Sequence, residues 1–79
     1  MPRGLNNWNF NDVVRFLRDY GFRQNYTEGS HFYYTGSYSQ KFRQVCVPFH
    51  GKKSIKPRTL KSIITQSGIP QKEWVDGNK

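Results

Sequence analysis

The apolar residues near the start of the chain recur at helical spacing. In WNFNDVVRFLRDYGF they fall three or four positions apart, which predicts a helix over about residues 10–20. Asn9 and Asp12 are spaced as a capping box at its N-terminus. Gly21 follows the last apolar residue as a left-handed residue that ends the helix. The first element is therefore expected to be an amphipathic helix with defined ends.

Three stretches rich in aromatic and β-branched residues follow, over about residues 22–27, 31–35 and 41–47. The segments EGS and GSYSQ between them carry Gly and Ser suited to turns, so the pattern predicts a three-stranded antiparallel meander. Successive side chains of a strand alternate between its two faces. His31 and Tyr33 are therefore expected on the face opposite to Phe32 and Tyr34.

A second helix is predicted over PRTLKSIITQSG, residues 57–68. Pro57 suits its first turn and Gly68 its C-terminal end. Its apolar stripe consists of Leu60, Ile63 and Ile64. A basic loop, FHGKKSIK, joins this helix to the third strand. Beyond the helix, IPQKEWV is expected to add one short helical turn with Trp74 packing back on the domain, and DGNK is expected to fray.

These elements predict a small α+β domain in the order α-β-β-β-α, with a three-stranded antiparallel sheet and two helices on one of its faces. The whole chain, residues 1–79, is expected to form one domain with a core over about residues 8–75. The other face of the sheet stays open to solvent and carries His31 and Tyr33. A domain of this size buries only about 60% of the surface of its unfolded chain, so any active site is expected to be shallow.

Charge is strongly segregated along the sequence. The chain has 13 Lys and Arg against 5 Asp and Glu, a formal net charge of +8. No acidic residue lies between residues 29 and 72, an interval that holds Lys41, Arg43, Lys52, Lys53, Lys56, Arg58, Lys61 and Lys72. Such a basic surface is typical of proteins that bind polyphosphates. A membrane surface is a weaker interpretation, because the sequence shows no basic amphipathic helix with a large apolar face and no apolar run of spanning length.

Cys46 is the only cysteine, which excludes an internal disulfide and a thiolate metal cluster. Its strand context, VCVP, predicts a small buried hydrophobe. The sequence shows no basic start followed by an apolar leader segment, so a cytoplasmic protein is expected. It also shows no Gly-rich phosphate loop, no GxSxG elbow and no histidines at metal-ligand spacing, so we expect neither a cofactor nor a metal.

The remaining candidate chemistry is that of histidine among cations. RNA carries its own nucleophile, the 2′-hydroxyl beside the scissile phosphate, so an enzyme needs a proton acceptor, a proton donor and cations around the developing charge. Histidine can fill the proton-transfer roles near neutral pH. His31 is either such a catalyst or a surface residue, and the residues alone leave both interpretations open. His50, in the basic loop, is a weaker candidate.

Several motifs together resemble the HicA family of small bacterial toxin ribonucleases. GF is followed by EGSHFYY and then by VCVPFHGKKSIKPRTLKSIITQSGI. This order is similar to the family pattern of a helix, GF, GSH with a strand, VPxH, a basic loop and TLxxIxxQxGI. The resemblance covers about residues 8–75. GSH and VPxH are weak signals singly, and their order and spacing make the combination specific.

The resemblance implies the fold of a double-stranded-RNA-binding domain and cleavage of messenger RNA without a metal or cofactor. It implies that the histidine of GSH, here His31, is catalytic. Gly29 of the same motif would give the turn its backbone freedom, and Ser30 would offer a hydroxyl near phosphate. His50, the histidine of VPxH, would anchor the loop or contact phosphate. The resemblance also implies a HicB-like antitoxin partner that covers the active surface.

The leading hypothesis is therefore a toxin-type endoribonuclease in which His31 transfers protons and Tyr33 stacks a base or assists. The residues expected to hold the RNA backbone are Lys52, Lys53, Lys56, Arg58 and Lys61. The alternative is a non-catalytic RNA-binding module that recognises a duplex by its shape. A DNA-binding partner of transcription is a weaker third interpretation, because the chain shows no helix-turn-helix signature. Glu28 stands where family members often carry Lys or Arg, which removes one expected phosphate contact.

Overall fold

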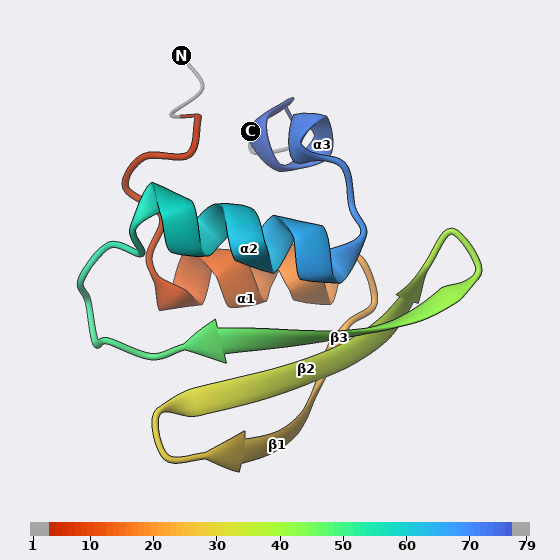
Figure 1. Cartoon of the computed structure of the whole chain (residues 1–79), viewed down its shortest axis with the longest axis horizontal. Coiled ribbons are helices and arrows are strands. Elements are labelled where there is room, and N and C mark those ends of the chain that lie inside the picture. Colours follow the sequence, from red (N-terminus) through yellow and green to blue (C-terminus); the bar gives the residue numbers. More distant parts are fainter. Residues whose placement is uncertain (1–3, 77–79) are drawn as a thin grey trace.

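The structure, a computed structural model, describes residues 4–76. Its elements, in chain order, are α1 (Phe10–Asp19), β1 (Arg23–Glu28), β2 (His31–Tyr38), β3 (Lys41–Pro48), α2 (Pro57–Ser67) and α3 (Gln71–Asp76). The strands form one antiparallel sheet in the order β1-β2-β3, and α1 and α2 both lie on one of its faces (Figure 1). The predicted α+β class and α-β-β-β-α order are confirmed, with α3 as the expected short addition. Residues 77–79, part of the segment predicted to fray, lie outside the described residues.

Helix α1 begins and ends through its own local sequence. The Asn9 side chain accepts a hydrogen bond from the Asp12 N–H at 2.9 Å, and the Asp12 carboxylate accepts one from the Asn9 N–H at 3.0 Å. These two bonds complete the predicted capping box. At the other end, the N–H groups of Gly21 and Phe22 donate to carbonyls of the last helical turn, at 2.9 Å each, in a Schellman motif. The motif turns Phe22 into the core.

The central strand is longer than the sequence predicts. GSYSQ is predicted as a turn, and this is wrong for its first three residues, because β2 runs to Tyr38 and only Ser39 and Gln40 connect it to β3. Gly36 serves close packing instead of a turn. A Cβ atom at this position would lie 2.7 Å from Cγ and 2.9 Å from Cα of Phe22, so no larger residue fits there without a shift.

One face of the sheet packs against the helices, and the other is open. Tyr34, Val45 and Val47 point from β2 and β3 into the core. The helices contribute fully buried side chains, among them Val13, Leu17, Leu60 and Ile63. The alternate residues of both strands point away from the helices, and they include His31 and Tyr33, as expected from the alternation.

Cys46 does not lie in the core. The alternation that buries Val45 and Val47 turns Cys46 to the open face, where it pairs with Tyr33 across the ladder and is half-buried. The prediction of a small buried hydrophobe is therefore wrong. The Cys46 N–H donates to Oε1 of Gln66 on α2 at 2.9 Å, which satisfies a backbone group on the free edge of β3.

Helix α3 is held against α1 by aromatic rings and one hydrogen bond. The ring of Trp74 stacks on Phe16 with centroids 3.9 Å apart and packs at a tilt against Trp8 at 5.6 Å. The Tyr20 hydroxyl donates to a carboxylate oxygen of Glu73 at 2.7 Å. Trp74 is fully buried, which confirms the prediction that it packs back on the domain.

Candidate functional site

The GSH motif forms the tight turn between β1 and β2. Glu28 and His31 pair across the ladder, so Gly29 and Ser30 alone make the loop. Gly29 has a φ of 61°, a left-handed value that glycine adopts without strain at the first central position of a two-residue hairpin loop. His31 is therefore the first residue of β2, and its side chain is exposed.

His31 lies on the central strand between two neighbours. Glu28 faces it from β1 and Pro48 from β3. Directly opposed side chains in an antiparallel ladder have their Cβ atoms about 4.5–5.5 Å apart. His31 is thus flanked by Glu28 on one side and by Pro48, the proline of VPxH, on the other.

A backbone hydrogen bond ties the GSH turn to the VPxH segment. The Phe49 N–H donates to the Ser30 carbonyl at 2.7 Å, one step beyond the last ladder pair. The Phe49 ring packs edge-on against Phe10 at 5.0 Å and lies 6.0 Å from Phe32. Residues 29–31 and 48–50, which are distant in sequence, are therefore held together at one end of the sheet.

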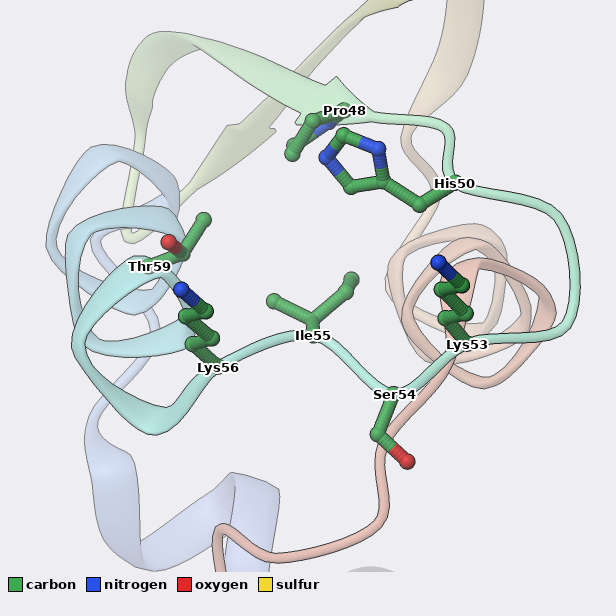
Figure 2. Close-up of a pocket in the computed structure, with 7 residues that line it drawn as sticks. All are labelled: Pro48, His50, Lys53, Ser54, Ile55, Lys56 and Thr59. Atoms are coloured by element: carbon green, nitrogen blue, oxygen red, sulfur yellow. The ribbon is translucent and has the colours of Figure 1, made fainter.

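A shallow pocket of about 500 Å³ opens between the end of β3, the basic loop and the first turn of α2 (Figure 2). Its lining residues are Pro48, His50, Lys53, Ser54, Ile55, Lys56 and Thr59. Figure 2 shows the His50 ring reaching over the pocket toward Pro48, with the side chains of Lys53 and Lys56 on opposite sides of the pocket. Because Pro48 also faces His31 across the ladder, the pocket adjoins the GSH turn.

The loop that carries the pocket is pinned to the start of α1. The Ile55 N–H donates to the Trp8 carbonyl at 2.6 Å, and Ser54 forms an isolated antiparallel bridge with Asn9. The Ile55 side chain is buried in the core. The position of the lysines on either side of this residue is therefore set by the core of the domain rather than by the loop alone.

The pocket is cationic from its side chains and from helix α2. The ionisable residues that line it, His50, Lys53 and Lys56, are all bases. Helix α2 begins at the pocket, with Lys56 as an N-cap that makes no side-chain capping bond, Pro57 in its first turn and no acidic residue there. The first N–H groups of a helix have no intrahelical acceptor and carry the positive end of its dipole. The arrangement suits a phosphate group.

The structure divides the predicted phosphate-binding residues into two groups. Lys53 and Lys56 line the pocket. Three others are exposed but do not line it: Lys52, Arg58 and Lys61. His50 joins the first group, whereas His31 lies outside the pocket on the open face of the sheet. Two further lining residues, Ser54 and Thr59, are not singled out by the sequence, because isolated Ser and Thr residues in a polar loop form no pattern.

Tyr26 is a second residue that the sequence does not single out. It stacks on Tyr33, with ring centroids 4.4 Å apart and planes at 7°. Strict alternation from the buried Phe22 would turn Tyr26 toward the helices. A register shift between Gln24 and Tyr26 adds one residue to β1 and brings Tyr26 to the open face. Nothing in the local sequence marks this bulge.

Tyr33 faces Cys46 of the third strand across the ladder. Hydrogen bonding with this thiol is the main reason that the pKa of Tyr33 is raised above its ordinary value. The nearby Tyr26 and Glu28 act in the same direction. The phenol therefore stays neutral at physiological pH, and Tyr33 lies between Tyr26 on β1 and Cys46 on β3.

Two further features of the described residues bear on the site. Among residues 4–76, no three His, Cys, Asp or Glu side chains gather in a way that could hold a metal ion. The same part of the chain has no helix with the length and apolarity needed to cross a membrane.

Comparison with known proteins identifies the family. A family model described as the HicA toxin of bacterial toxin–antitoxin systems matches residues 10–69, which is well over half of the chain. Searches of curated proteins and of solved structures find no match. The matched segment begins with α1, ends just after α2 and includes both His31 and the cationic pocket. The chain therefore belongs to the HicA toxin family of bacterial toxin–antitoxin systems.

Proposed function

We propose that this HicA-family protein is an endoribonuclease that cleaves messenger RNA without a metal, with His31 as the group that transfers protons. The observation that carries the proposal is the 2.7 Å hydrogen bond from the Phe49 N–H to the Ser30 carbonyl. This bond joins the turn that presents His31 to the loop that leads into the cationic pocket. An exposed imidazole and a site suited to phosphate therefore lie at the same end of the sheet.

The reaction needs little more than these groups. The 2′-oxygen of a nucleotide attacks the adjacent phosphorus, its proton passes to a base, and the bond to the 5′-oxygen breaks as that oxygen receives a proton. His31 serves one of these proton transfers, which typically contribute about 10²- to 10⁴-fold in rate. Lys53 and Lys56 stabilise the charge on the phosphate oxygens. The exposed Lys52, Arg58 and Lys61 extend the cationic track along the RNA backbone.

The expected partner is a HicB-like antitoxin that covers this surface. The family assigns the chain to a toxin–antitoxin system, and the net charge of +8 favours an acidic partner. Opposite charges on two such surfaces give fast and salt-sensitive association. Because the substrate is messenger RNA, the proposed compartment is the cytoplasm.

The test compares wild-type protein with His31→Gln on labelled single-stranded RNA in excess EDTA. The matched control is His50→Gln, which removes the only other histidine of the chain. We expect His31→Gln to bind RNA as the wild type does and to cut it at least about 100-fold more slowly. We expect His50→Gln to change RNA affinity more than the rate at saturating RNA. Circular dichroism establishes that all three proteins fold.

Each outcome of this test distinguishes the alternatives. Equal cleavage by wild type and His31→Gln would refute the assignment of His31. Cleavage that disappears in EDTA and returns with a divalent cation would refute the metal-free mechanism. Tight binding without any cleavage by the wild type would favour a non-catalytic RNA-binding module, which the same cations would also support.

A further inference from the structure

The open face of the sheet carries two neighbouring rows of side chains near the GSH turn. The row at the turn consists of Glu28, His31 and Pro48, and the next row consists of Tyr26, Tyr33 and Cys46. Both rows point away from the helices. Adjacent rows on one face are two residues apart, which is about 6.6 Å along a strand. The tyrosine pair is therefore close enough to His31 for a single nucleotide to contact both.

The two tyrosines form a flat aromatic surface in which Tyr26 is exposed and Tyr33 is half-buried. Their rings are almost parallel, at 7°, with centroids 4.4 Å apart. Tyr33 occupies the central strand, and Tyr26 occupies β1, the edge strand, with no further strand beyond it among the described residues. Tyr26 is 46% exposed although its ring is stacked. An unpaired nucleobase has the shape and the π-face to extend such a stack.

Cleavage of RNA by its own 2′-hydroxyl gives a reason for such a platform. The attacking oxygen must lie in line with the leaving 5′-oxygen, and a regular A-form helix does not hold the backbone in that geometry. A nucleotide whose base is turned out and stacked on protein can adopt it. Recognition of unpaired RNA bases by exposed aromatic side chains of a sheet follows the same principle.

Building on the proposed function, we infer that Tyr26 and Tyr33 form a stacking platform for one unpaired base of the RNA, next to the phosphate that His31 acts on. Tyr33 supplies the inner ring on the central strand, and Tyr26 offers the outer ring face at the edge of the sheet. The platform makes the protein select single-stranded RNA, because a base paired in a duplex cannot reach it. The cationic pocket holds the backbone, and the tyrosine pair decides which nucleotide is presented.

The competing explanation is that the tyrosines are a cross-strand pair that only stabilises the sheet. A cycle of two perturbations separates the explanations. All proteins carry His31→Gln, so that the RNA stays intact. Each binds a series of short single-stranded RNAs in which one base at a time is replaced by an abasic ribose, with and without Tyr26→Ala. Phe42→Ala is the matched control, since Phe42 is a 72% exposed aromatic on the same face of β3 but lies further from His31.

We expect one abasic position to lower affinity about 5- to 150-fold in the protein that retains Tyr26, the range found for base–aromatic stacking. The same RNA should bind the Tyr26→Ala protein with less than a twofold loss, because the partner ring is already gone. Tyr26→Trp should restore the sensitivity, and Phe42→Ala should leave it unchanged. Two results would overturn the platform. One is an abasic position that lowers RNA affinity by the same factor with and without Tyr26→Ala. The other is a Phe42→Ala protein that loses its sensitivity to the abasic position as the Tyr26→Ala protein does.

The outcome is separable from that of the nuclease test. If wild-type protein cuts RNA and His31→Gln does not, yet base removal and Tyr26 show no coupling, the platform fails and the nuclease proposal stands. If coupling appears but the wild type never cuts, the platform stands as a binding site and the nuclease proposal fails. Absence of binding to every RNA in the series would overturn both.

Discussion

Replacing Lys53 and Lys56 together by glutamine tests whether the pocket holds the RNA backbone. Both side chains line the pocket, and glutamine keeps much of their length while it removes two charges. The flanking Ile55 is buried, so the backbone that carries the two positions remains anchored. We therefore expect the variant to fold normally and to lose RNA affinity through charge alone.

The size of the effect follows from the number of phosphate contacts. Each contact to single-stranded nucleic acid contributes about 0.7 to the slope of log affinity against log salt concentration, so two contacts contribute about 1.4. Between about 50 and 200 mM salt, a slope of 1.4 amounts to about a sevenfold change in affinity. The wild type should thus lose about seven times more affinity over this range than the double variant.

The assay is fluorescence anisotropy of a labelled single-stranded RNA, titrated at several salt concentrations in the His31→Gln background. Lys41→Gln is the control for long-range charge. Lys41 and Pro48 are the two ends of β3, about 24 Å apart along the strand, which exceeds the Debye length of about 8–10 Å. Its removal should leave the slope unchanged. An unaltered slope in the double variant, or an equal change in Lys41→Gln, would show that the RNA backbone does not use the pocket.

Three further predictions concern stability. Gly36→Ala should lower the free energy of unfolding by about 1–3 kcal/mol in chemical denaturation, because its Cβ would lie within 3 Å of the ring behind it; an unchanged value would contradict the close packing. Ser39 and Gln40 have φ values of 55° and 66°, which Asn and Gly adopt more easily in a two-residue hairpin turn. The double variant Ser39→Asn, Gln40→Gly should therefore raise the free energy of unfolding by about 1 kcal/mol and the melting temperature by about 4–8 °C. A lower melting temperature would contradict the assigned turn. The bond to Glu73 raises the pKa of Tyr20 to about 12, above the value of the unfolded chain. The stability advantage of wild type over Tyr20→Phe should therefore be constant below pH 10 and decline from pH 10 to 12, and a pH-independent difference would argue against the bond.

The amino-acid sequence by itself determined the elements whose causes are local. The capping box of Asn9 and Asp12 sets the start of α1, and Gly21 and Gly68 set the ends of α1 and α2. Alternation along β2 placed His31 on the open face. These features depend on hydrogen bonds and side-chain directions within a few residues of chain. They can therefore be predicted from short stretches of the sequence.

Other features depended on contacts between distant segments, and only the tertiary structure decided them. In the sequence Gly36 resembles a turn residue, and only the fold shows that Phe22 packs against it. The bulge in β1 that brings Tyr26 onto Tyr33 is a property of the pairing with β2, not of β1. The meeting of the GSH turn with the pocket depends on the pairing of His31 with Pro48 and on the bond that the Phe49 N–H makes at the same end of the sheet. Motif spacing singled out the candidate residues, whereas their proximity required the folded sheet, because sequence order carries no distance between strands.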